Sequence, residues 1–221
     1  MGIAENIREI KESLPEQTSL VAVSKFHPVE AIREAYDAGQ RIFGESRAQE
    51  LKTKRLLLPD DIEWHFIGQL QSNKVKDIAP FIHTIQSVDS LKLIKEIESQ
   101  AAKYNRPIHV LLEIHIAQEE SKTGFTPEEC RALLDTGIQN QLPHVRIGGL
   151  MAMASLTEDT SLIRKEFKEV YSLFKEIKRS YFAKDDNFNV LSMGMSSDYE
   201  IAVSEGSTMI RVGSHIFGER E

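Results

Sequence analysis

The chain has 221 residues, enough for one sizeable hydrophobic core and within the usual length of a single (β/α) barrel. Lys and Arg number 27 against 34 Asp and Glu, a net charge of −7 without a dense basic run, so we expect no general nucleic-acid binding. A single cysteine, Cys130, excludes an internal disulfide, and no signal-peptide core or membrane-length apolar run is present, so we expect a cytoplasmic protein without membrane association.

Helices and short apolar strands are predicted to alternate along the chain. An amphipathic helix comes first, because Ile3, Ile7, Ile10 and Leu14 recur at helical spacing. Eight apolar runs are then predicted as strands: 19–25, 41–46, 63–70, 81–88, 109–117, 145–153, 189–195 and 207–218. Most runs are continuously apolar, which is typical of parallel strands covered on both faces.

Eight such βα units predict an α/β fold, a TIM-type (β/α)8 barrel with an extra N-terminal helix. An open doubly wound sheet is the alternative, but it usually carries a glycine-rich turn after the first strand, where this chain has Ser-Lys-Phe-His-Pro. Capping-box spacings predict helix starts at Ser46, Thr126 and Ser197.

Lys25 stands where the apolar character of the first strand stops. Active sites of such barrels lie at the carboxyl ends of the strands, and barrel walls partly desolvate a lysine placed there. Since a desolvated, neutral amine adds to an aldehyde to form a Schiff base, Lys25 is a candidate for that chemistry. The alternative is a lysine that only caps the strand and extends into solvent.

The last two strands end in turns rich in small and hydroxyl-bearing residues. Ser196 and Ser197 follow the seventh strand, and Gly213 and Ser214 follow the eighth. The loops after these two strands commonly bind phosphate in barrels of this kind, and Gly213 lets the backbone approach an anion closely. Each turn alone could merely cap a helix, but the pair predicts a phosphate site.

An amine and a phosphate site at one barrel mouth suit a phosphorylated aldehyde. Pyridoxal phosphate is one such compound, and the substrate of a Schiff-base sugar-phosphate aldolase is another. Arg211 lies two residues before Gly213 and should share its strand face. There it could donate to a pyridine nitrogen and, by staying charged, disfavour protonation of that nitrogen. Pairing of Arg211 with a barrel carboxylate is the structural alternative.

Six segments resemble, in order, those of the pyridoxal-phosphate homeostasis proteins, the YggS-like family. Within residues 20–220 they are VAVSKFHP, FGESRAQE, WHFIGQLQSNKVK, ESKTGF, IGGLMAMAS and LSMGMSSDYEIAVSEGSTMIRVGSHIFG. The resemblance implies one domain over residues 1–221, a barrel of the alanine-racemase type (PLP fold type III), with pyridoxal phosphate held as a Schiff base by Lys25. It implies a carrier or regulator of the vitamin B6 pool without established catalytic turnover.

The resemblance also implies roles for individual residues. Ser196, Gly213 and Ser214 would hold the phosphate, and Arg211 would face the pyridine nitrogen. Many family members carry Asn where this chain has Ser46. The full set of predicted cofactor-binding residues is Lys25, Ser46, His65, Met193, Ser196, Ser197, Arg211, Gly213 and Ser214.

Two enzyme activities remain as alternatives: a weak pyridoxal-phosphate-dependent amino-acid racemase using Lys25, and the aldolase. Racemisation needs acid–base groups on both faces of the substrate, and alanine racemases take the second group from another domain, for which we expect no counterpart. A pure interaction module would leave Lys25 and the two turns unexplained. We therefore expect a monomeric carrier or regulator, with no catalytic residue assigned, whose partners are pyridoxal phosphate and apo forms of the enzymes that use it.

No metal site is expected from the sequence. His109, Glu113 and His115 fall on one face of the fifth strand, but an extended strand spreads them too far apart to converge easily on one ion. Lys122, in the loop after that strand, is a second candidate amine near the mouth, although most loop lysines are simply solvated.

Overall fold

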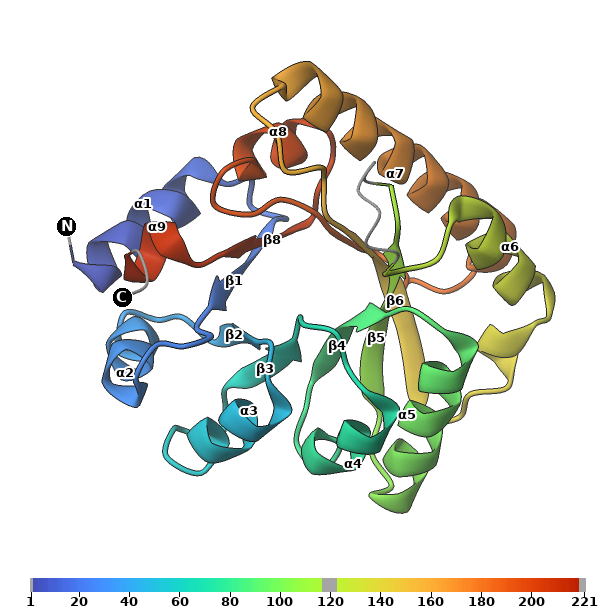
Figure 1. The fold of residues 1–221 in the computed structure, drawn as a ribbon, viewed down its shortest axis with the longest axis horizontal. Coiled ribbons are helices and arrows are strands. Elements are labelled where there is room, and N and C mark those ends of the chain that lie inside the picture. The colour runs from blue at the N-terminus through green and yellow to red at the C-terminus, as the bar shows by residue number, and fades with distance from the viewer. Residues whose placement is uncertain (1, 117–122, 219–221) are drawn as a thin grey trace.

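The strands form one closed, parallel barrel. The computed structural model describes residues 2–116 and 123–218, in which eight strands pair in chain order and β8 closes onto β1 (Figure 1). The strands are β1 Ser19–Val23, β2 Ile42–Glu45, β3 Glu63–Phe66, β4 Thr84–Val88, β5 Ile108–Ile114, β6 Val145–Ala152, β7 Val190–Ser192 and β8 Met209–Val212. The TIM-type barrel predicted from the sequence is confirmed.

Helices surround the barrel (Figure 1). They are α1 Ile3–Ser13, α2 Val29–Asp37, α3 Ala48–Arg55, α4 Val75–Ile78, α5 Leu91–Lys103, α6 Pro127–Asp135, α7 Thr160–Tyr181, α8 Tyr199–Ser204 and α9 Ser214–Phe217, with 3-10 turns η1 Ser72–Lys74 and η2 Ile138–Asn140. Within the described ranges, no helix combines the length and the apolar character needed to span a membrane.

The predicted extra helix is α1, which precedes β1 and packs against α2 and α9. Its apolar stripe buries Ile7 and Ile10. Asn6 Nδ2 donates a hydrogen bond to the carbonyl oxygen of Ile216 in α9, at 3.0 Å. The first and last helices therefore lie side by side, as Figure 1 shows.

The core lies between the strands and the surrounding helices. Phe43 of β2 and Trp64 of β3 pair across the two strands, are buried, and hold their rings 6.0 Å apart. Such a side chain contributes roughly 1.5–3 kcal/mol when it leaves water. In the same register, Gly44 pairs with His65, so the next residue of each strand faces the barrel interior. The alternation therefore sends apolar groups outward to the helices and leaves polar groups inside.

Of the three predicted capping boxes, one is confirmed. The hydroxyl of Thr126 accepts a hydrogen bond from Glu129 N, and the Glu129 carboxylate accepts one from Thr126 N. The other two predictions are wrong, because α3 begins after Arg47 and α8 after Asp198, and neither residue caps its helix with its side chain.

The polar end of the first predicted strand belongs to a turn. Pairing of β1 stops at Val23, and His27 N donates to the carbonyl oxygen of Ser24 at 3.1 Å. Phe26 adopts a left-handed conformation with φ of 69°, which a strand cannot accommodate. Lys25 therefore lies in a tight turn just beyond the carboxyl end of β1.

Two adjacent glycines of β6 give a matched test of the barrel wall. A Cβ on Gly149 would lie 1.7 Å from the backbone oxygen of Val190 in β7, whereas a Cβ on Gly148 would meet nothing closer than 3.8 Å. Since backbone cannot move aside, we expect Gly149→Ala to lower the free energy of unfolding by about 3 kcal/mol. Gly148→Ala should change it by less than about 1 kcal/mol. Urea titration measures both, and equal effects would contradict the close approach of the two strands.

Candidate functional site

The turn that carries Lys25 is held from below by a buried ionic network. Lys54 Nζ donates to the Ser24 carbonyl oxygen at 2.8 Å, to Glu45 Oε1 at 2.8 Å and to Glu50 Oε1 at 2.6 Å. Ser24 Oγ donates to Glu45 Oε1 at 2.6 Å, and Phe26 N donates to Glu50 Oε1 at 2.7 Å. Both neighbours of Lys25 are thus fixed by this network.

The central ion pair of this network is almost completely shielded from water. The side chain of Glu45 is fully buried and that of Lys54 is 7% exposed. Burial raises the pKa of the Glu45 carboxyl, while the charge and hydrogen bond of Lys54 act in the opposite direction. Removing either partner would strand a charge in the interior, so the pair fixes the turn only as a unit.

The strand-eight turn lies beside the strand-one turn. Val21 pairs with Arg211, so Val23 and Gly213, two residues further on, lie at the same level. A Cβ on Gly213 would lie only 3.2 Å from the Val23 oxygen. Glycine therefore favours this close approach, and Gly213 lies next to the turn that carries Lys25.

The turn after β7 contacts the turn after β8. Gly213 N donates to Ser196 Oγ at 3.3 Å, which links the turns after β7 and β8. Asp198 accepts a hydrogen bond from Met195 N at 2.6 Å and so closes the turn that contains Ser196. Gly194 has a φ of 94°, and a Cβ there would lie 2.7 Å from Ala202 Cβ, so only glycine suits this position.

Arg211 lies inside the barrel, 4% exposed. Its Nη1 donates to Ser192 O at 2.9 Å and Ser192 Oγ at 2.7 Å, and Nη2 donates to Ala152 O at 3.0 Å. Burial lowers the pKa of Arg211 to about 10, against the opposing effect of Asp198 and Glu113. The guanidinium is therefore charged at neutral pH, and its hydrogen bonds go to neutral oxygens.

The polar chain continues from Arg211 across the interior. Ser192 Oγ donates to Gln86 Oε1 at 2.7 Å, and Gln86 Nε2 lies 2.8 Å from His65 Nδ1. Burial lowers the pKa of His65 to about 3, so the ring is neutral. Arg211 and His65 are thus joined through two intervening side chains.

The remaining predicted residues differ in their surroundings. Met193 is fully buried in the core, whereas Ser197 and Ser214 are exposed. Ser46 follows β2, and its backbone oxygen would lie 2.6 Å from a Cβ on Gly68. The structure thus brings Lys25, Ser196 and Gly213 together at the mouth, while Lys122 lies outside the described residues.

Sequence reasoning missed Glu45, Lys54 and Glu50. The i,i+4 spacing of Glu50 and Lys54 indicates an ordinary helix-surface pair, and nothing local points to Glu45 on β2. Asp198 and Gln86 were also missed, because their partners are distant in the sequence or belong to the backbone.

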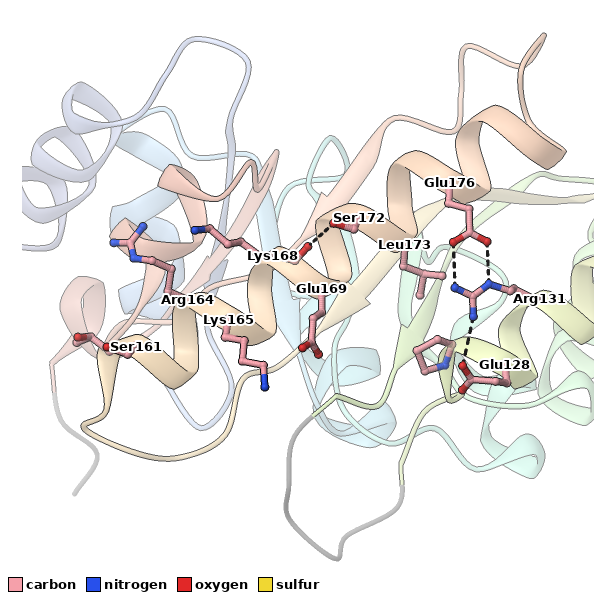
Figure 2. A pocket seen from close by; sticks show the side chains of 12 residues that line it. Glu128, Arg131, Ser161, Arg164, Lys165, Lys168, Glu169, Ser172, Leu173 and Glu176 are labelled. Carbon is pink, nitrogen blue, oxygen red and sulfur yellow. Dashed lines mark hydrogen bonds and ion pairs between the residues drawn. The ribbon is translucent and has the colours of Figure 1, made fainter.

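A large groove lies outside the barrel, between α6 and α7, with a volume of about 750 Å³ (Figure 2). Charged side chains line it, and Arg131 makes a two-pronged ion pair with Glu176 at 2.7 and 2.9 Å on one side. None of the nine predicted cofactor-binding residues lines this groove. Its walls are surfaces of these two helices.

Comparison with known proteins agrees with this fold. The family model for the alanine racemase N-terminal domain matches residues 2–221. The pyridoxal phosphate homeostasis protein of Pasteurella multocida is 39% identical, with 100% of this chain and 99% of that protein covered. The relative from Aquifex aeolicus with the same name is 40% identical, over 91% of this chain and 87% of that protein.

Solved structures give the same result. PipY of Synechococcus elongatus without PLP has a TM-score of 0.91 and 39% identity, and PipY with PLP bound has a TM-score of 0.90 and 38% identity; both alignments cover 98% of this chain and 100% of PipY. The chain belongs to the alanine racemase N-terminal domain family and, within it, to the pyridoxal phosphate homeostasis proteins.

Proposed function

We propose that this protein binds pyridoxal phosphate at the mouth of the barrel and takes part in pyridoxal phosphate homeostasis. The observation that carries the proposal is the meeting of the Lys25 turn with the Ser196–Gly213 contact across the β1–β8 closure. Membership of the homeostasis family and the PLP bound to PipY support it. The cofactor supplies three groups, namely an aldehyde, a phosphate and a pyridine ring. The aldehyde is the group that reacts with an amine.

The residues at the mouth fit these three parts. Gly213 approaches Val23 so closely that a side chain would intrude, and Ser196 and Ser214 stand beside it with hydroxyls for a phosphate. Arg211 provides a fixed positive charge below the mouth, held by Ser192 and Ala152. A charged guanidinium disfavours protonation of a pyridine nitrogen near it and so weakens the ring as an electron sink.

Lys25 is the proposed tether, holding the cofactor as a Schiff base. The Glu45–Lys54–Glu50 network holds the residues on either side of Lys25, so the amine is presented from a rigid turn. Of the other predicted contacts, we assign those of Ser46 and Ser197 to the same site. We place His65 and Met193 outside it, because His65 reaches Arg211 only through Gln86 and Ser192, and Met193 is buried in the core. A carrier role requires reversible attachment, which an imine open to water provides.

The proposal also includes the domain organisation, location, oligomeric state and partners of the protein. We infer a single domain over residues 1–221, working in the cytoplasm as a monomer and handing pyridoxal phosphate to apo enzymes that require it. The thiol of Cys130 is buried, and burial raises its pKa to about 12, which suits a structural and unreactive role. The charge of −7 makes general association with nucleic acid unfavourable.

Replacement of Lys25 tests the tether. We expect the wild-type protein with pyridoxal phosphate to show the visible absorption of an imine and, after borohydride reduction, a mass adduct on the peptide that contains Lys25. Lys25→Ala should lose both, while Lys92→Ala, at an exposed position of α5, should keep them. An adduct that persists on another lysine in Lys25→Ala would contradict the assignment. An amino-acid racemase assay on the same samples tests the carrier role, which robust turnover dependent on Lys25 would contradict.

Replacement of Ser196 tests the phosphate end. Ser196→Ala removes a hydroxyl from a charged ligand, a loss of about 1.5–3 kcal/mol, so we expect a roughly 10- to 100-fold rise in the Kd for pyridoxal phosphate. Pyridoxal, which has no phosphate, should bind both proteins equally. Ser204→Ala, at the end of α8, is the control with unchanged Kd for both compounds. Equal weakening for pyridoxal and pyridoxal phosphate would place Ser196 away from the phosphate.

Replacement of Lys54 tests the network beneath the tether. Lys54→Met leaves Glu45 buried without its cation, so we expect the free energy of unfolding to fall by about 3–5 kcal/mol. The loss should shrink on acidification, because the pKa of Glu45 is raised in the folded state and folding then favours its protonated form.

The double change Glu45→Gln with Lys54→Met should recover much of that loss in urea titrations. Lys52→Met, at an exposed position of the same helix, should change stability by less than about 0.5 kcal/mol. A small effect of Lys54→Met alone would show that the pair does not hold the turn.

A further inference from the structure

We propose that Glu63, His65 and His83 form a binding site for a divalent transition-metal ion, with Zn²⁺ as the preferred ion. The site lies at the N-terminal end of the barrel: Glu63 begins β3, and His83 directly precedes β4. Since the cofactor mouth is at the carboxyl ends of the strands, the two sites lie at opposite ends. This inference goes beyond the proposed function and does not depend on it.

The distances between the ligand atoms are close to those of a metal site. One ligand atom from each of the three residues lies within 4.8 Å of the others, and His83 Nε2 is 3.8 Å from Glu63 Oε2. Ligands on a tetrahedral zinc ion with bonds of about 2.0–2.1 Å lie roughly 3.4 Å apart. Since the His65 and His83 rings lie parallel, 5.7 Å apart, the side chains must rotate and shorten these separations by up to about 1.4 Å to bring the three atoms onto one ion.

The buried ring of His65 supplies the second, independent observation. His65 is 2% exposed, and its Nε2 has no hydrogen-bond partner among the described residues. A buried polar atom without a partner costs about 1–3 kcal/mol. A metal bond at Nε2 would remove that cost, and the ring that carries this atom belongs to the cluster.

The opposite nitrogens of both rings are already engaged. His65 Nδ1 lies 2.8 Å from Gln86 Nε2, and His83 Nδ1 lies 2.8 Å from Thr84 Oγ1. Metal-binding histidines are normally oriented by a hydrogen bond of this kind at the second nitrogen. Binding through His65 Nε2 places the ring proton on Nδ1, and Gln86 then accepts it through Oε1 after a half-turn of its amide.

Access and ligand chemistry favour Zn²⁺. The side chains of Glu63 and His83 are 48% and 42% exposed, so an ion and a bound water can reach them from solvent. The His109 ring stacks on His83 at 5.0 Å and supports its orientation. Two imidazoles and one carboxylate suit zinc, whereas Mg²⁺ and Ca²⁺ prefer oxygen ligands throughout.

The test is metal binding by the full-length, untagged chain after treatment with a chelator. Zn²⁺ is titrated against a chromophoric competitor, and Co²⁺ is added separately to read the d–d absorption of the bound ion. We expect one ion per chain and a cobalt spectrum of low coordination number. Glu63→Gln and His83→Gln, both at partly exposed positions, should each weaken Zn²⁺ binding by more than about 10-fold, since even loss of a residue that only supports a ligand costs about 10–100-fold.

His144 offers a matched control. It directly precedes β6 as His83 precedes β4, and it pairs with Glu98 at 2.9 Å, but it has no third ligand within reach among the residues described. His144→Gln should bind Zn²⁺ like the wild-type chain, and circular dichroism should show that every variant is folded. Absence of stoichiometric binding would overturn the proposal. So would affinity that Glu63→Gln and His83→Gln leave unchanged, or an equal loss in His144→Gln.

Discussion

All eight strands run in the same direction, and this constraint divides the molecule into two chemical ends. Every carboxyl end opens at one mouth, where the turns after β1, β7 and β8 meet, and every amino end opens at the other. Chain direction alone thus separates Lys25, Ser196 and Gly213 from Glu63 and His83. No second domain or loop insertion is needed to create the two environments.

The two ends are connected through the barrel interior by polar side chains. Arg211, Ser192, Gln86 and His65 form an unbroken run of contacts between 2.7 and 2.8 Å. Each of these residues is buried, so the energy of each contact is little screened by water. The interior network therefore joins residues near both ends of the barrel through direct side-chain contacts.

The barrel was predictable from the sequence because its strands are short, apolar and regularly spaced. The positions of Lys25, Ser196 and Gly213 near strand ends were predictable from the apolar runs that contain or precede them, and the structure brings these residues together. Strand ends themselves were overestimated: the first run includes Lys25, but a left-handed Phe26 converts its end into a turn.

Features that depend on distant partners were not predictable. The wrong capping boxes at Ser46 and Ser197 had suitable residue types, but the N-caps of α3 and α8 are Arg47 and Asp198, each one residue later than the pattern predicted. The Glu63–His65–His83 group was invisible for a different reason, since it combines alternate residues of one strand with a residue before the next. Only the pairing of β3 with β4 brings them together.

The contact between α1 and α9 has a consequence for how the chain folds. Asn6 and Ile216, 210 residues apart, touch in the finished molecule, and β1 cannot gain its β8 neighbour until Met209–Val212 have been synthesised. Contacts between residues so distant in sequence slow folding, because the entropy of closing the intervening loop is lost before the contact stabilises anything. Until then, β1 presents an open strand edge to the solvent, and a nascent chain in this state is exposed to pairing with its neighbours.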